Sequence, residues 1–84
     1  MNKSPLPPLS KEAKSLVLGS LYEHYKGDRY KLLQVARHSE TLEELVVYQA
    51  LYGNGDVWVR PLIMFLEDVL IDGEIKARFK RIAV

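Results

Sequence analysis

The side chains with the clearest chemical potential in this sequence are two histidines set among carboxylates. His24 and His38 lie near a group of glutamates in the chain, namely Glu23, Glu40, Glu43 and Glu44. Imidazole nitrogens and carboxylate oxygens together suit a divalent metal, and pairing of the two strands that carry the histidines could bring them near each other. However, their spacing matches no established ligand pattern. We therefore predict no metal site, and expect both histidines to be surface or hydrogen-bonded side chains.

Three other kinds of catalytic site find little support. His38-Ser39-Glu40 contains the residue types of a hydrolytic triad, but neighbours in sequence rarely converge as nucleophile, base and orienting group. The chain has no cysteine, which excludes thiol nucleophiles and cysteine metal sites. Its glycines stand singly in turns, so no phosphate-binding loop is present. We expect a non-catalytic protein without a cofactor, and an enzyme would require a mechanism that these residues do not reveal.

Size and charge narrow the function classes further. The chain has 84 residues, of which 48% are hydrophobic, so one small core is expected and a deep cleft is not. No apolar run approaches the roughly 20 residues of a membrane span, and we expect a cytoplasmic protein. The net charge is +1, but residues 39–74 carry eight acids and one base, while the remainder carries three acids and eleven bases. Such a dipolar molecule could present its basic side to an anion.

The first ten residues contain three prolines and end in a helix-start signal. We predict a flexible leader over residues 1–9 and a single β domain with an N-terminal helix over residues 10–84. Ser10 is a suitable N-cap, apolar residues recur at spacings of three and four, and Gly19 can end the helix in the left-handed conformation. The helix is expected from Lys11 to Leu18.

From Leu21 onward, β-forming residues alternate with turn signals. Asn54-Gly55 and Asp72-Gly73 are the strongest hairpin signals, because both central residues of such turns adopt positive φ. We predict six strands over residues 21–25, 30–36, 45–52, 57–60, 69–71 and 74–81, with a helical turn over residues 62–68. In the last strand, Ile75, Ala77 and Phe79 should form a buried face. The fold predicted is mainly β: a small SH3-like barrel or a strongly bent antiparallel sheet of five to six short strands with a short N-terminal helix.

The register of the Asn54-Gly55 hairpin decides which side chains share a face. An even-length loop places Gln49 opposite Arg60 and Leu51 opposite Trp58. One face is then the core, formed by Val46, Tyr48, Ala50, Tyr52, Val57 and Val59. The other face carries the row Gln34, Gln49 and Arg60 beside the row Leu32, Leu51 and Trp58. An odd-length loop would exchange the faces. The N-terminal helix could alternatively cover the apolar row and make it a second core.

These considerations favour a protein or peptide interaction module that uses a sheet face. The candidate binding residues are Gln34, Gln49, Trp58, Arg60, Arg37 and His38. The alternative is an RNA or single-stranded nucleic-acid binder that uses aromatic and basic side chains, among them Tyr30, Trp58, Arg29, Lys31, Arg60, Lys76, Arg78, Lys80 and Arg81. The low net charge argues against this alternative. We expect a monomer or a weak dimer that does not bind membranes.

Several sequence motifs resemble a known family. They are Tyr22-Glu23-His24-Tyr25-Lys26-Gly27, Ala36-Arg37-His38-Ser39-Glu40-Thr41, Trp58-Val59-Arg60-Pro61-Leu62 and the pair Arg78-Phe79. Together they are similar to a small bacterial family catalogued as a domain of unknown function, over about Gly19 to Lys80. Members of that family tend to have a proline where this chain has Ala77. The resemblance implies a bacterial origin and a shared compact fold, and it implies no activity.

Overall fold

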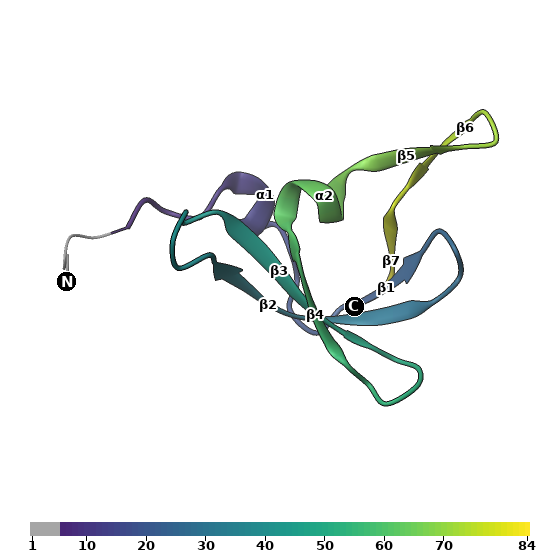
Figure 1. Ribbon diagram of the computed structural model, residues 1–84, viewed down its shortest axis with the longest axis horizontal. Helices are drawn as coiled ribbons and strands as arrows, with labels where there is room; N and C mark the ends of the chain where they lie inside the picture. Colours follow the sequence, from purple (N-terminus) through teal and green to yellow (C-terminus); the bar gives the residue numbers. More distant parts are fainter. Residues whose placement is uncertain (1–5) are drawn as a thin grey trace.

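A computed structural model describes residues 6–84 as a mainly antiparallel β protein (Figure 1). Residues 1–5 of the predicted leader lie outside the described part. The elements, in chain order, are α1 Lys11–Lys14, β1 Leu21–His24, β2 Arg29–Arg37, β3 Glu44–Ala50, β4 Val57–Pro61, α2 Leu62–Leu66, β5 Asp68–Ile71, β6 Glu74–Ala77 and β7 Phe79–Ala83. Neither helix of residues 6–84 is long and apolar enough to cross a membrane.

The five-stranded sheet has the order β4-β3-β2-β1-β7, and β5 and β6 form a separate two-stranded sheet. The main sheet is open, because β4 and β7 are its edges in the described part of the chain, so the structure does not confirm the SH3-like barrel of the two predicted alternatives. The sheet is nevertheless strongly bent. The guanidinium of Arg60, on edge strand β4, lies 5.5 Å from the ring centroid of Phe79 on the opposite edge strand.

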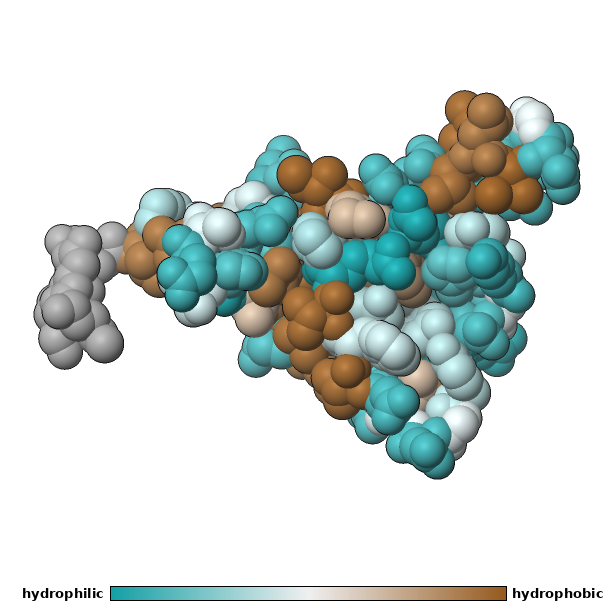
Figure 2. Space-filling model, in the orientation of Figure 1, coloured by the Kyte–Doolittle hydropathy of each residue, from teal (hydrophilic) through white to brown (hydrophobic). Residues whose placement is uncertain are grey.

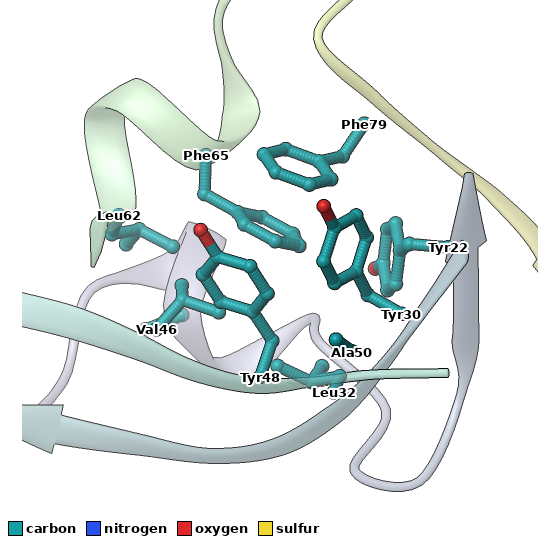
Figure 3. Close-up of a cluster of buried hydrophobic side chains, with 10 residues drawn as sticks. Tyr22, Tyr30, Leu32, Val46, Tyr48, Ala50, Leu62, Phe65 and Phe79 are labelled. Atoms are coloured by element: carbon teal, nitrogen blue, oxygen red, sulfur yellow. The ribbon is translucent and has the colours of Figure 1, made fainter. Parts of the chain in front are cut away.

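The core is a cluster of aromatic side chains inside this bend (Figure 3). Phe65, from α2, stacks on Phe79 with ring centroids 4.4 Å apart. Tyr48 meets both rings, at 5.6 and 5.4 Å, and Tyr22 meets Phe65 edge-on at 5.1 Å. Edge-on and offset ring pairs add to the stabilisation that burial supplies. Because Phe65 and Phe79 come from α2 and β7, the core depends on segments that follow the first four strands.

Helix α1 is shorter than predicted. Ser10 caps it as expected, since its hydroxyl accepts the N–H of Ala13 at 3.1 Å, and Ala13 is buried in the core. The helix ends at Lys14 rather than Leu18. The hydroxyl of Ser15 donates to the carbonyl of Glu12 at 2.7 Å, and such a local bond competes with helical continuation.

Two features of the register overturn the predicted faces. The last pair of the β3–β4 ladder, Gln49 with Val57, encloses the seven residues 50–56, an odd number, and Tyr48 lies opposite Trp58. In β2, an irregularity between Leu32 and Gln34 turns Leu32 toward the core, where it is fully buried. Val46, Tyr48 and Ala50 are core residues, as predicted. By contrast, the other three residues of the predicted core face are exposed: Tyr52, Val57 and Val59.

The predicted last strand is two strands. It breaks at Arg78, whose N–H donates to the carbonyl of Glu67 and whose carbonyl accepts from Tyr25. Beyond the break, Phe79 is buried, whereas Ile75 and Ala77 are exposed, so the predicted continuous buried face is wrong. The β5–β6 hairpin projects from the body of the molecule (Figure 1), and no layer formed by residues 6–84 covers it.

Candidate functional site

The concave side of β4 borders a hollow whose walls are aromatic. It has a volume of about 210 Å³ and is lined by Tyr30, Tyr48, Tyr52, Trp58 and Arg60, which we call the aromatic hollow. Trp58 faces the same side as the buried Tyr48, yet it is 49% exposed. An indole on the core side of a sheet is usually covered, because leaving a large apolar surface in water is unfavourable. Here it forms part of an open wall that a ligand can reach.

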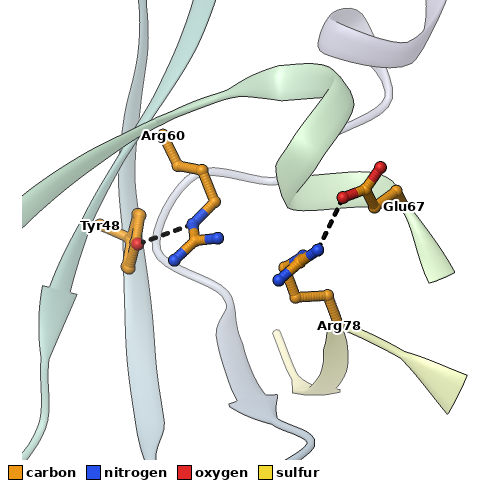
Figure 4. A network of polar contacts seen from close by, with 4 residues as sticks. All are labelled: Tyr48, Arg60, Glu67 and Arg78. Carbon is orange, nitrogen blue, oxygen red and sulfur yellow. Dashed lines mark hydrogen bonds and ion pairs between the residues drawn. The ribbon is translucent and has the colours of Figure 1, made fainter. Parts of the chain in front are cut away.

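Arg60 supplies the charge of the aromatic hollow. Its Nε donates to the hydroxyl of Tyr48 at 3.2 Å (Figure 4). Among the described residues, no carboxylate forms an ion pair with it, whereas Arg78 pairs with Glu67 at 2.6 Å. Because only the Nε of this guanidinium is bonded to Tyr48, its remaining N–H groups are available for a carboxylate or phosphate. The hollow thus combines flat apolar walls with one oriented cation.

The tyrosines of the aromatic hollow hold one another in place. The hydroxyls of Tyr30 and Tyr52 are 2.9 Å apart and share a hydrogen bond. Burial, with this bond as a further cause, raises the pKa of Tyr30 well above its ordinary value. Tyr30 also meets Tyr48 edge-on at 5.3 Å. Consequently Tyr30 is held between Tyr48 and Tyr52, and the three rings form a preorganised wall.

In the described part of the chain, strand β4 has a free backbone edge beside the aromatic hollow. The N–H of Ala50 donates to the carbonyl of Asp56 at 2.9 Å. Because hydrogen-bonded and non-bonded pairs alternate in an antiparallel ladder, the N–H and C=O groups of Val57 and Val59 point away from β3. Pro61, which lacks an N–H, ends the strand. The edge can therefore receive another strand.

The structure separates the predicted binding residues into three places. Trp58 and Arg60 lie together in the aromatic hollow. Gln34 and Gln49 lie on the opposite face, paired with Val47 and Val57, so the predicted row of Gln34, Gln49 and Arg60 does not exist. The Gln49 amide donates to the carbonyl of Gly55 at 3.0 Å and holds the β3–β4 loop.

Arg37 and His38 lie at the far end of β2. Arg37 pairs with Glu44 across the ladder and donates to the carbonyl of Pro7. His38 Nδ1 accepts the N–H groups of Glu40 and Thr41, at 3.1 and 3.3 Å. The bond from Arg37 holds the N-terminal segment, and the bonds to His38 hold the β2–β3 turn. Both residues therefore have structural roles.

The structure does not bring the two histidines near each other. His24 ends β1 beside the β1–β2 turn, whereas His38 follows the opposite end of the nine-residue strand β2. Within residues 6–84, no three side chains among His, Asp and Glu gather as a metal site would require. His24 instead packs on Phe79 and Tyr25.

Sequence reasoning missed Tyr48 and Tyr52 as part of a site. Both were assigned to the core by an even-length loop. The odd-length alternative would have placed Tyr48 and Trp58 on one face, and this gathering of two large aromatic residues was the signal available. Tyr52 lies beyond the last ladder pair, in the β3–β4 loop, so no register argument could have found it.

Two other hollows lie elsewhere on the surface. One, of about 560 Å³, is formed between α1 and α2 by Leu62, Ile63 and Leu66 with the glutamates Glu12, Glu44 and Glu67 and the cap residue Ser10. The other, of about 350 Å³, is lined by Glu23, His24, Tyr25, Lys76, Ala77 and Lys80, and we call it the basic hollow. Two of the three glutamates of the first hollow are already engaged, Glu44 with the N–H of Ser10 and Glu67 with Arg78.

Comparisons with other proteins place the chain in a family. The sequence matches no curated protein. A crystal structure of a DUF1653 protein from Bordetella bronchiseptica is similar to it, with 34% identity, a TM-score of 0.75, and coverage of 84% of this chain and 92% of that chain. A family model described as "Protein of unknown function (DUF1653)" matches residues 20–81. The match to most of the chain, together with the shared fold, shows that this protein belongs to the DUF1653 family.

Proposed function

We propose that this protein is a non-catalytic peptide-binding module, in which an extended segment of a partner pairs with the free edge of β4. The observation that carries the proposal is the half-exposed Trp58 beside Arg60, a guanidinium that no carboxylate of residues 6–84 neutralises. Trp and Arg are the side chains that most often anchor protein interfaces. Strand addition at a sheet edge supplies backbone hydrogen bonds, and pockets for alternate side chains supply specificity.

The alternation of β4 predicts the spacing of the recognised side chains. A partner residue that exchanges hydrogen bonds with Val59 points to the convex face. Its two neighbours then point into the concave face, one beside Trp58 and one beside Arg60. The ligand is therefore a segment with an apolar residue and an acidic residue two positions apart. The apolar side chain lies against the indole, and the carboxylate is bound by the guanidinium.

The experiment is a selection of binding peptides from a random display library, followed by measurement of the affinities of the selected peptides. The peptides should share an acidic residue two positions from an apolar one. Because a charge-assisted hydrogen bond contributes about 1.5–3 kcal/mol, Arg60→Gln should weaken binding by roughly tenfold or more. Trp58→Ala should weaken it at least as much. Methylation of the peptide nitrogen that faces Val59 should also abolish binding, because it removes a ladder bond.

The matched control is Gln34→Ala, an exposed substitution on the opposite face of the sheet. It should leave the affinity unchanged. Peptides that bind the Arg60 and Trp58 variants as tightly as the unsubstituted protein would contradict the proposal.

A second candidate, single-stranded nucleic-acid binding, is favoured by the basic hollow. There the rings of His24 and Tyr25 lie tilted to each other with centroids 4.3 Å apart, and Lys76 and Lys80 line the same hollow. Rings beside ammonium groups can hold a base and its phosphate. Glu23 lines the same hollow, which disfavours a polyanion. This candidate predicts that binding of an oligothymidylate weakens steeply with salt and with Lys80→Glu, whereas peptide binding to the aromatic hollow should not respond to that substitution.

A further inference from the structure

The β5–β6 hairpin carries an apolar pair that the described molecule leaves in water. Leu70 and Ile75 lie directly opposite each other and are 71% and 75% exposed. Every residue of β6 is exposed. The apolar surface over this hairpin is visible in Figure 2, apart from the rest of the molecule. A two-stranded hairpin standing alone is marginally stable in water, so this one would be stabilised by a further strand.

The backbone of β6 is oriented to receive that strand. The two-residue turn Asp72-Gly73, with φ of 50° and 79°, joins Ile71 to Glu74. The pair that closes such a turn is hydrogen-bonded, and the next pair is not. Ile75 therefore directs its N–H and C=O away from β5. Among residues 6–84, no strand pairs with β6 on that side.

The charges of β6 suit a second copy of the same strand. In an antiparallel pairing centred on Ile75, Glu74 lies opposite Lys76 of the second copy, and Lys76 lies opposite its Glu74. Within one chain these side chains already lie on the same face, 3.8 Å apart. Strand β5 has no such symmetry, because a pairing centred on Leu70 would place Asp68 opposite Asp72. Opposite charges stabilise directly facing pairs, and like charges destabilise them.

We propose that this protein forms a two-fold symmetric dimer, in which β6 of each copy pairs antiparallel about Ile75. The two hairpins then form one four-stranded sheet. On one of its faces, Leu70 and Ile75 of both copies lie side by side in a single row. The facing Glu74 and Lys76 side chains belong to non-hydrogen-bonded pairs, where side chains approach most closely. The contact is small by the standard of permanent interfaces, so the dimer dissociates on dilution.

The test uses charge exchange and sedimentation velocity over micromolar to millimolar concentrations. The unsubstituted protein should dimerise with increasing concentration. Lys76→Glu gives a chain with two facing carboxylates, and Glu74→Lys gives one with two ammonium groups. Each variant alone should dimerise about tenfold more weakly, because two attractive pairs become repulsive. An equimolar mixture of the two should recover the affinity as a heterodimer, and the double exchange should recover the homodimer.

Lys14→Glu, an exposed substitution of the same kind on α1, is the matched control and should not change dimerisation. Circular dichroism establishes that each variant is folded. A protein that remains monomeric at millimolar concentration would overturn the proposal. So would a dimer that the two charge variants leave unchanged. Peptide binding to the aromatic hollow is independent of the hairpin, so either proposal can fail without the other.

Discussion

Apolar side chains on strand faces are buried in the aromatic core but exposed in the β5–β6 hairpin. Phe65 and Phe79 are 1% and 7% exposed, whereas Leu70 and Ile75, which lie between them in the chain, are 71% and 75% exposed. Both regions contain antiparallel strands with apolar residues on one face. The five-stranded sheet is bent and covered by α1 and α2, whereas no other element of the described residues covers the hairpin. Alternation identifies residues that share a face, and burial requires a second layer over that face.

The largest expected effect is the loss of a core ring. Phe65→Ala should lower the free energy of unfolding by about 3–5 kcal/mol, because it leaves a cavity between Phe79, Tyr48 and Tyr22. Urea denaturation at low protein concentration would measure it.

The control for this substitution lies in the uncovered hairpin. Leu70→Ala should change the free energy of unfolding by no more than about 0.5 kcal/mol, since the side chain is exposed in the monomer. A cost comparable with that of Phe65→Ala would mean that the hairpin is part of the folded core, and the contrast between the two regions would disappear.

Much of the fold was predictable from local signals. The turn residues Asn54-Gly55 and Asp72-Gly73 located two hairpins, and the prediction of a mainly β protein with a short N-terminal helix is confirmed. The predicted strands lie within a few residues of those observed, except that the last one breaks at Arg78. Its backbone bonds join it to Glu67 and Tyr25, residues distant in the sequence. No local pattern encodes those bonds.

The candidate site was predictable only in part. Trp58 and Arg60 were identified by residue type, and they do lie in one hollow. Their partners were assigned wrongly, because the faces depend on the parity of one loop and on one irregularity in β2. A one-residue difference in register turns every side chain to the other face. Residue types indicate which side chains can bind a ligand, but the register of strand pairing determines which of them lie on the same face.

An intermediate effect is expected from the helix that covers one end of the main sheet. Ser10→Ala removes the acceptor for the N–H of Ala13, and loss of such a cap costs about 1 kcal/mol. Thermal or urea unfolding would measure the change. This result would sharpen the contrast between the two regions, since α1 contributes the cover that the hairpin lacks.

Ser15→Ala is the matched control for the cap. It removes an exposed bond to the carbonyl of Glu12 at the other end of the same helix, and it should be close to neutral. Equal losses from Ser10→Ala and Ser15→Ala would show that the cap has no special role in holding α1.

The smallest expected effect is a pH dependence that originates where the core meets the base of the hairpin. Burial lowers the pKa of His24, and the positive charges of Arg60, Lys26 and Arg78 lower it further, while Asp28 opposes them. Below the ordinary histidine pKa of about 6.5, the unfolded chain therefore binds a proton before the folded chain does. Stability should be full above that pH and should fall as the pH decreases toward the lowered value. His24→Gln should remove this slope, so that the difference in unfolding free energy between the two proteins is constant above neutrality and shrinks in mild acid.

Hydrogen bonds from Ser10 lower the pKa of Glu44, and stabilisation by that carboxylate persists until more acidic conditions, so the two contributions separate. Urea titrations at closely spaced pH values would measure both. A difference that stays constant through mild acid would show that His24 is protonated equally in the folded and unfolded chains, and that the packing of its ring on Phe79 does not exclude the charge.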